Sequence, residues 1–184
     1  MNKRFIVFLS DSITGGGAEL SFRKIVEPYL SDVNNCRLCI IILDKSRLFE
    51  RWKNSPCVWF FHQGLVLTGL SKVLLIFWSL VIPFLALYNS LLGYQPCIVS
   101  FQTRSNIIAI LTKLISLNSI PILISERIHI ETYLSFHPLG SCYSFLIRAL
   151  YKFADIIVCN SRDSSLSLSR LLDVPLSRIS TVVN

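Results

Sequence analysis

Polar and charged side chains follow the apolar runs of this sequence, at the positions where buried strands would end. They are His62, Gln102, Arg104, Ser125, Glu126 and Arg127. Guanidinium groups present a planar fork of donors that fits phosphate, while hydroxyl and amide groups match the hydroxyls of a sugar. These residue types predict a site for a polyhydroxylated ligand that carries phosphate.

A run of glycines adds a second feature of such a site. Gly15, Gly16 and Gly17 follow the apolar run 5–9, and Glu19 lies at the start of an amphipathic segment. Glycine lets the backbone approach a ligand closely, and a helix that begins there points free N–H groups at an anion. Because the run lacks the spacing of a dinucleotide fingerprint and the lysine of a P-loop, a tight turn without a ligand is an equal interpretation.

Several of these candidates have a structural alternative. His62 is the candidate general acid or base because its side chain titrates near neutrality, although a single histidine after a strand is more often structural. Glu126 and Arg127 follow a wholly apolar run, which favours a functional pair over a solvated strand end. Ser161 and Asp163 are interpreted as capping residues of the helix that follows them.

No set of metal ligands is complete in the sequence. Cys36 and Cys39 have the spacing of half a zinc knuckle, but no second pair follows at a suitable distance. His129 and His137 lie on either side of Glu131 without a third well-placed ligand. We therefore predict neither a metal site nor a bound cofactor.

The elements that position these residues alternate along the chain. Apolar, strand-like runs occur at 5–9, 36–43, 57–61, 97–101, 122–125, 155–159 and 179–183. Helical periodicity occurs at 18–29, 44–54, 106–117, 142–153 and 163–172. Strands separated by such helices predict an α/β fold, a Rossmann-like parallel sheet flanked by helices. Ligands of such sheets bind beyond the carboxyl ends of the strands, where the polar residues stand.

The segment 73–92 carries no charge and is long enough to cross a membrane. Pro83 would kink a helix there, and a crossing would separate the strands before and after it. We expect instead a helix that is buried in the domain or partly sunk in a membrane interface, with Lys72 at its edge. An integral membrane anchor is the alternative.

Composition limits the class of protein and of partner. The 184 residues are 52% hydrophobic with a net charge of +7, and no repeat or low-complexity linker divides them. We predict one domain, 1–184, that is attracted to anionic surfaces. Scattered lysines and arginines do not predict binding of nucleic acid. The six cysteines lie mostly in apolar runs, which indicates a reduced, cytoplasmic setting.

Five groups of residues follow one another along the chain in an order that is characteristic of a protein family. They are Gly15–Glu19; Ser100–Phe101 with Asn106–Ala109; Ile124–Arg127; Leu146–Val158 with Asn160–Ser161; and Leu171–Ile179 with Val182–Asn184. In this order and spacing the chain resembles the N-terminal, acceptor-side domain of family 4 glycosyltransferases, enzymes of the two-domain GT-B fold. The resemblance covers essentially the whole chain.

The resemblance implies transfer of a sugar from a nucleotide-sugar to a lipid-linked or polysaccharide acceptor, at the inner face of the cytoplasmic membrane. It implies that the loop of Gly15–Gly17 and Glu19 approaches the donor diphosphate. Glu126 and Arg127 would line the cleft near the transferred sugar or acceptor, and we place His62, Gln102, Arg104 and Ser125 there too. Cations and helix N-termini would stabilise the leaving diphosphate without a metal.

The sequence also departs from the family. The family's nucleotide-binding half is a C-terminal domain, and this sequence reaches Asn184, where the linker to that domain would begin. We therefore expect little or no transferase activity from these residues alone. Ile128-His129-Ile130 stands where many relatives carry Asn and Pro, which affects the expected acceptor contacts. The alternatives are a truncated remnant, or a non-catalytic membrane-associated subunit that pairs with a separately encoded C-terminal domain.

Overall fold

A parallel β-sheet forms the centre of the protein. The computed structural model describes residues 3–11, 17–32, 34–43, 58–62 and 71–182. Within them the sheet has the strand order β3-β2-β1-β4-β5-β6-β7, and each neighbouring pair is parallel. The strands are β1 Lys3–Ser10, β2 Cys36–Ile42, β3 Val58–His62, β4 Tyr94–Phe101, β5 Ile122–Glu126, β6 Ile156–Cys159 and β7 Ile179–Thr181. The predicted Rossmann-like α/β fold is confirmed.

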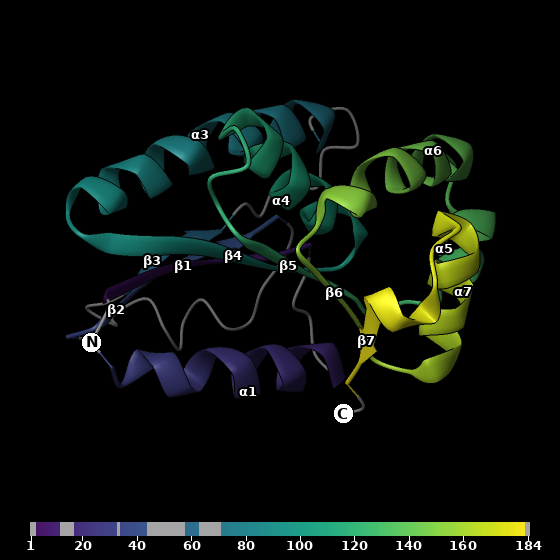
Figure 1. Cartoon of the computed structure of the whole chain (residues 1–184), viewed down its shortest axis with the longest axis horizontal. Helices are drawn as coiled ribbons and strands as arrows, with labels where there is room; N and C mark the ends of the chain where they lie inside the picture. The colour runs from purple at the N-terminus through teal and green to yellow at the C-terminus, as the bar shows by residue number, and fades with distance from the viewer. Residues whose placement is uncertain (1–2, 12–16, 33, 44–57, 63–70, 183–184) are drawn as a thin grey trace.

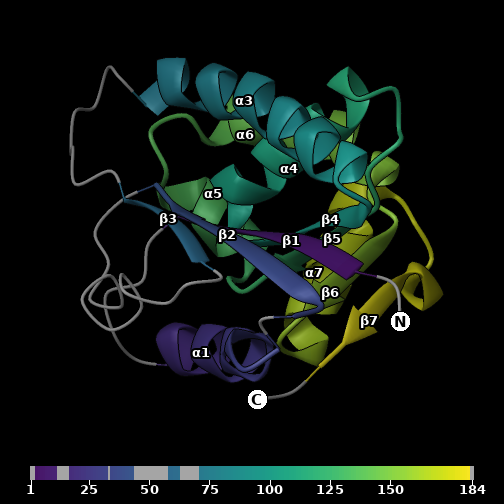
Figure 2. The ribbon, with the colours of Figure 1, turned by 90° about the vertical axis from the view of Figure 1, so that its left-hand side faces the viewer.

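The helices lie on both faces of the sheet, as right-handed crossovers require. They are α1 Gly17–Leu30, α3 Ser71–Leu91, α4 Thr103–Ile115, α5 Ile130–Phe136, α6 Gly140–Leu150 and α7 Arg162–Leu172, with the 3₁₀ turns η1 Tyr151–Phe153 and η2 Leu176–Arg178. Figures 1 and 2 show α1 on one side of the sheet and α3, α4 and α6 on the other. The strand order reverses between β1 and β4, so the carboxyl ends of these strands are where ligands of such sheets bind.

Alternation along the strands divides the core into two parts. Phe5, Val7 and Leu9 of β1 are buried in the cluster that also contains the inner faces of α3, α4 and α6. Ile6 and Phe8 point to the opposite face and pack against α1. Both faces of the central strands are thus apolar, which explains the continuous hydrophobic runs in the sequence.

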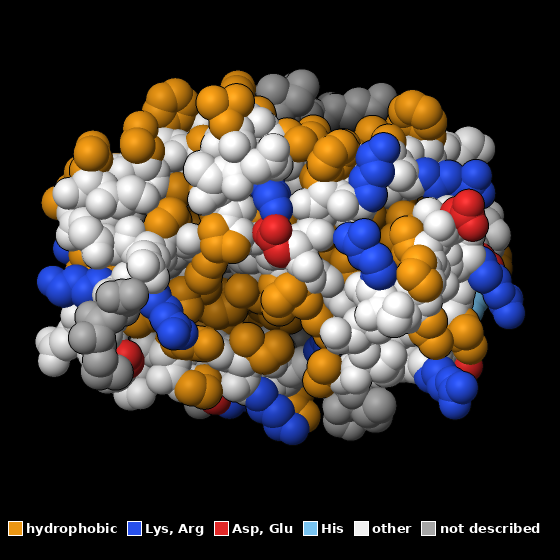
Figure 3. Space-filling model, viewed as in Figure 1, with side chains coloured by type: hydrophobic (Ala, Val, Ile, Leu, Met, Phe, Trp, Pro, Cys, Tyr) orange, Lys and Arg blue, Asp and Glu red, His pale blue; other side chains and the backbone are white. Residues whose placement is uncertain are grey.

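The two faces are covered unequally. On the α1 side, a groove of about 960 Å³ runs beneath β1, β4 and β5, and its floor includes Val99 and Leu123. Figure 3 shows it as a hydrophobic hollow in the molecular surface. The helices that follow β4, β5 and β6 pack in the core of the other face, so their crossovers leave this part of the sheet open.

Helix α3 contains residues 73–91 of the uncharged segment and packs against the core of the domain. Trp78, Ile82 and Ala86 are buried against the core, and Asn89 is buried near the end of the helix. The Asn89 side chain donates to the Leu85 carbonyl at 2.9 Å, so a polar group on the buried face is satisfied. Among the residues that the structure describes with their side chains, no helix is both long and apolar enough to cross a membrane.

Three local features differ from the sequence expectation. Strand β4 begins at Tyr94 and includes Pro96, because β4 pairs only with β1 until the pairing with β5 begins at Ile98. Residues 130–136, for which no helix was predicted, form the short helix α5. Helix α4 begins three residues earlier than its periodicity predicts, at Thr103.

The predicted N-cap at Ser161 is confirmed: its hydroxyl accepts from the Ser164 N–H at 3.1 Å.

Candidate functional site

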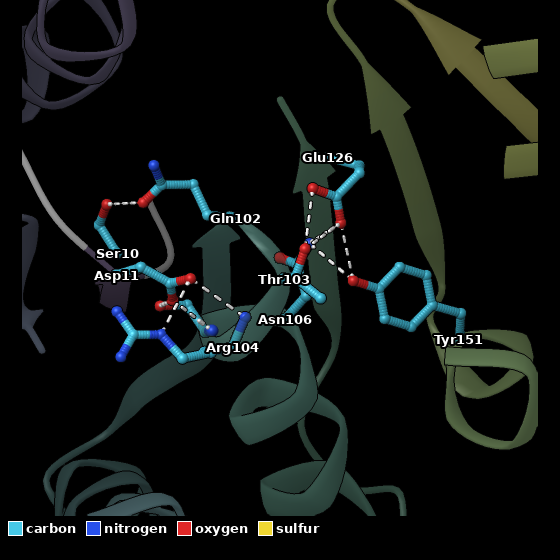
Figure 4. Close-up of polar contacts among 9 residues, drawn as sticks. Ser10, Asp11, Gln102, Thr103, Arg104, Asn106, Glu126 and Tyr151 are labelled. Atoms are coloured by element: carbon cyan, nitrogen blue, oxygen red, sulfur yellow. Dashed lines mark hydrogen bonds and ion pairs between the residues drawn. The ribbon is translucent and has the colours of Figure 1, made fainter. Parts of the chain in front are cut away.

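The candidate site lies at the carboxyl ends of β1, β4 and β5. Ser10 ends β1 and Asp11 follows it, Gln102 and the first turn of α4 follow β4, and Glu126 ends β5 (Figure 4). These segments are far apart in the chain, with Ser10 and Glu126 separated by 116 residues, and the reversal of strand order brings them together.

Asp11 caps α4 from a distant part of the chain. Its Oδ1 accepts from the Ser105 N–H and from the Ser105 hydroxyl, both at 2.7 Å, and its Oδ2 accepts from the Arg104 N–H at 3.2 Å. The two N–H groups belong to the first turn of α4, where backbone N–H groups have no acceptor within the helix. Arg104 also forms an ion pair with the carboxylate, with Nε 3.5 Å from Oδ2. Burial raises the pKa of Asp11, and Arg104 and Ser105 oppose that rise.

Gln102 joins β4 to α4 in an unusual backbone conformation. Its φ of 74° and ψ of 161° lie in a region that is almost restricted to glycine and costs about 1–3 kcal/mol for other residues. Hydrogen bonds hold it there, since its N–H donates to the Ser125 carbonyl and its carbonyl accepts from the Asn106 N–H. The side-chain oxygen accepts from the Ser10 hydroxyl at 3.4 Å, which places the amide at the β1–β4 junction.

Glu126 is fully buried and surrounded by donors. Its carboxylate accepts from the Tyr151 hydroxyl at 2.8 Å, from the Thr103 hydroxyl at 3.2 Å and from the Asn106 amide at 3.3 Å. Burial is the main cause that raises the pKa of Glu126 to about 7; the Tyr151 bond lowers it, the charge of Asp11 raises it, and the other two donors lower it. Glu126 therefore supports the site from inside the protein.

Asn106 and Tyr151 complete this buried network. The Asn106 side chain accepts from the Ser100 hydroxyl at 2.7 Å, and its amide group donates to the Ser125 carbonyl and lies 3.3 Å from the Tyr151 hydroxyl. Tyr151 is buried at the start of η1, directly after α6, and its hydroxyl donates to Glu126 at the end of β5. The sequence analysis did not assign Asn106 or Tyr151 to the site. The available signal for Asn106 was a polar residue directly before the apolar run 107–111 of α4.

The side chain of Arg127 lies on the opposite face of the sheet from that of Glu126. Residues alternate between the faces of β5, so Ser125 and Arg127 line the groove on the α1 side, while Glu126 points into the network under α4. The Arg127 guanidinium is half-buried, and that burial lowers its pKa. Its backbone carbonyl accepts from the Asn160 side chain at 3.2 Å.

Five of the predicted site residues are Gly15, Gly16, Gly17, Glu19 and His62, and the structure describes them only in part. Gly15 and Gly16 lie outside the described residues. Gly17 and Glu19 are in the first turn of α1, and His62 is the last residue of β3, at its carboxyl end. The side chains of Glu19 and His62 lie outside the described part, so the roles assigned to them stay predictions.

No family model and no curated protein matches the sequence. Solved structures do match its fold. A lipopolysaccharide outer core galactosyltransferase, WaaB, in its apo form has a TM-score of 0.64 and 14% identity, covering 98% of this chain and 45% of WaaB. Anabaena Alr3699/HepE in complex with UDP and glucose has a TM-score of 0.66 and 15% identity, covering 98% of this chain and 44% of HepE.

A third solved structure that matches the fold is described as an epimerase. It is a putative UDP-N-acetylglucosamine 2-epimerase from Listeria monocytogenes, with a TM-score of 0.56 and 12% identity, and 96% of this chain covers 44% of that one. The chain therefore spans a little under half the length of these structures. At such low identity the likeness shows the fold alone: a Rossmann-like domain of the kind found in GT-B glycosyltransferases.

Proposed function

We propose that this chain is the acceptor-side, N-terminal domain of a GT-B glycosyltransferase, which transfers a sugar from a nucleotide-sugar to a lipid-linked or polysaccharide acceptor. The observation that carries the proposal is the polar cluster at the β1–β4 junction. A buried aspartate, an arginine and a strained glutamine meet there at the point of strand reversal, in a fold matched over 98% of the chain by a galactosyltransferase. Strain of this kind persists where the surrounding structure holds it and is concentrated at functional sites.

The residues divide into those that can reach a ligand and those that support them. Arg104 is partly exposed and offers the cation for a phosphate group, and the Gln102 amide and Ser10 hydroxyl match sugar hydroxyls. Glu126 is enclosed by protein donors and holds Thr103 in place at the start of α4. In this proposal the loop around Gly15–Gly17 approaches the donor diphosphate, and a nucleotide-binding domain outside these residues forms the other wall. Little activity is expected without that wall.

A binding experiment tests the proposal. The protein labelled with ¹⁵N is titrated with UDP-glucose and UDP-galactose, and the backbone amides of Gln102, Arg104 and residues 15–19 are followed by NMR. We expect saturable shifts at these amides, and loss of the shifts in Arg104→Gln. The matched control is Arg148→Gln, which removes an exposed arginine on α6. Absence of shifts at the β1–β4 junction with either ligand would refute the site, and turnover comparable with that of two-domain enzymes would refute its description as half an enzyme.

We also propose that the outer face of α3 contacts a membrane, which would give access to a lipid-linked acceptor. Phe77, Leu80, Phe84, Leu87 and Leu91 form a continuous stripe on the side of α3 that faces away from the core. Phe84 is 72% exposed and Leu91 is 79% exposed. Figure 3 shows the resulting hydrophobic side chains along the upper edge of the molecule, above α3. Five large exposed apolar side chains in one stripe are typical of an interaction surface.

The charges around this face favour an anionic lipid surface. The sequences of α3, α4 and α6 contain no Asp or Glu, while α6 and the turn after it expose Arg148 and Lys152. Both views place α3 and α6 in the same outer layer (Figures 1 and 2). Apolar side chains beside cations are the combination that holds a helix in the interface of an acidic bilayer.

Sedimentation with lipid vesicles tests this contact. We expect the protein to bind vesicles of phosphatidylcholine and phosphatidylglycerol more strongly than vesicles of phosphatidylcholine alone. Phe84→Asp with Leu87→Asp should weaken binding about a hundredfold, because two buried apolar side chains contribute on the order of 3 kcal/mol or more. Phe136→Asp is the matched control, since Phe136 is 84% exposed but lies on α5. Equal binding by the double variant and the wild type would refute the assignment of this face.

A further inference from the structure

We infer that the hydroxyl groups of Tyr133 and Tyr143 form a subsite for an uncharged sugar ring of the acceptor, next to the polar cluster at the β1–β4 junction. The inference rests on the proposed function and adds to it a part of the site that the sequence analysis did not identify. Tyr133 belongs to α5, and Tyr143 belongs to α6.

Three aromatic rings pack together where α5 meets α6. The centroid of the His137 ring lies 4.7 Å from that of Tyr143 and 5.1 Å from that of Tyr133, and the two tyrosine centroids lie 6.0 Å apart. Gly140 permits this close approach of the two helices, since a Cβ there would clash with the Leu134 carbonyl oxygen. Because each ring is held by the other two, the polar ends of the rings have defined positions.

The polar ends of these rings are available to a ligand. Among the residues that the structure describes, neither tyrosine hydroxyl has a hydrogen-bond partner, and neither is one of the unpaired polar atoms that are wholly buried. The hydroxyl of Tyr143 therefore reaches the surface although that residue is only 9% exposed. His137 adds a third donor: its Nδ1 accepts from the Leu139 N–H at 3.1 Å, so the neutral ring carries its proton on Nε2.

The charges of the polar cluster act on both hydroxyls. Burial is the main cause that raises the pKa of each tyrosine, while the charge of Asp11 also raises it and that of Arg104 lowers it. The charge of Glu126 adds to the rise in the pKa of Tyr133. Since charged groups shift a pKa mainly at short range, both hydroxyls lie close to the junction. Their raised pKa keeps them protonated at neutral pH, so both can donate.

The path of the chain places the rings at the same edge of the sheet. Helix α5 begins at Ile130, shortly after Glu126 ends β5. Ile130 and Tyr143 are buried in the same core cluster as Ile107 and Ile108 of α4. Figure 2 shows α4, α5 and α6 on one side of the sheet. The rings therefore lie beside the carboxyl ends of the strands, where ligands of such sheets bind.

The chemistry of this subsite matches an uncharged sugar. Two hydroxyls and a neutral imidazole provide hydrogen bonds without charge, whereas phosphate is bound by cations or by free N–H groups at a helix terminus. Tyrosine combines an apolar ring with a polar tip, and ligand sites commonly join apolar surface to a few well-placed polar groups. Because the proposed domain is the acceptor-side half, the sugar assigned to the subsite is one of the acceptor.

A purely structural role of the rings makes a different prediction. If the rings only fill the space between α5 and α6, loss of a hydroxyl that has no partner in the protein changes neither stability nor binding. Tyr133→Phe and Tyr143→Phe keep the ring and remove only the hydroxyl. Stability should therefore be unchanged in both variants, and the binding of a sugar separates the two roles.

The experiment titrates ¹⁵N-labelled protein with the methyl glycosides of glucose, galactose and N-acetylglucosamine, and separately with UDP, while NMR follows the backbone amides. We expect at least one glycoside to shift amides of residues 130–143 in a saturable manner. Tyr133→Phe and Tyr143→Phe should each weaken its binding about fivefold, since one hydrogen bond is lost. The unfolding temperature should stay the same, and the dissociation constant of UDP should stay within about twofold. Tyr29→Phe is the matched control, because Tyr29 is also partly buried but packs on the other face of the sheet.

Each outcome decides the inference. Equal binding of the glycoside by the wild type and both variants overturns the subsite and leaves the proposed function standing. Absence of glycoside shifts at residues 130–143 also overturns the subsite, and UDP shifts at Gln102 and residues 15–19 then test the proposed function separately. Weaker UDP binding in the tyrosine variants would assign the hydroxyls to the donor and overturn their assignment to the acceptor.

A second measurement covers variants that do not fold. In the wild type with the glycoside bound, nuclear Overhauser contacts between the sugar and the ring protons of Tyr133 and Tyr143 support the subsite. Contacts to other parts of the protein alone refute it.

Discussion

The buried carboxyl group of Glu126 gives the most specific prediction about stability. Its pKa is raised from an ordinary value of 4.5 to about 7, chiefly by burial. The folded protein therefore keeps a proton on Glu126 at pH values where the unfolded chain has released it. Stability from this group is complete below pH 4.5 and is lost as the pH rises toward 7.

The size of the effect follows from the shift. A change of one pKa unit corresponds to 1.36 kcal/mol, so a rise from 4.5 to about 7 is equivalent to about 3 kcal/mol. Glu126→Gln removes the titration and keeps the shape of the side chain. Gln can also accept from the Tyr151 hydroxyl and stay hydrogen-bonded within the network.

Urea unfolding across this pH range measures the prediction. We expect the free energy of unfolding of the wild type to fall, relative to that of Glu126→Gln, by about 3 kcal/mol between pH 4.5 and a pH above 7. The matched control is Glu131→Gln, which removes an exposed carboxylate from α5 without altering the network. Parallel curves for wild type and Glu126→Gln over the whole range would show that Glu126 titrates like an exposed carboxyl group, and would refute the account of the network.

Three further substitutions test other parts of the structure. Tyr151→Phe removes the 2.8 Å donor to Glu126 and should lower the free energy of unfolding by about 1–3 kcal/mol in urea titrations; no change would show that the bond is not formed. Gln102→Gly relieves the backbone strain, so its thermal stability should equal or exceed that of the wild type while UDP binding in the NMR titration weakens. Gly140→Ala places a Cβ about 2.0 Å from the Leu134 carbonyl oxygen and should cost about 1–3 kcal/mol or more in urea unfolding; wild-type stability would show that α5 and α6 separate easily.

The sequence by itself predicted the features that depend on near neighbours. Apolar runs such as 36–43 correspond to strands because both faces of the central sheet are buried. The cap at Ser161 was predictable because its partner, the Ser164 N–H, is three residues away. Polar residues after β4 and β5 were expected at one edge of the sheet, and Thr103 does contact Glu126 there.

Only the tertiary structure decided which of these polar residues meet. Glu126 and Arg127 are adjacent in the chain, yet one points into the network under α4 and the other into the groove on the α1 side. The start of α4 at Thr103 depends on Asp11, which local periodicity around the helix could not reveal. Tyr151 belongs to a helix pattern in the sequence, and its hydroxyl is placed beside Glu126 by the packing of α6.

The physical reason is the range of the interactions involved. The hydrophobic periods that mark a helix or a strand are set by side chains within a few residues, so they can be recognised in a short stretch of the sequence. A hydrogen bond between Asp11 and Ser105 depends on the order of strands in the sheet and on the path of each crossover. Strand order is a property of the assembled sheet, so the contacts that define the candidate site exist only once β1, β4 and β5 lie side by side.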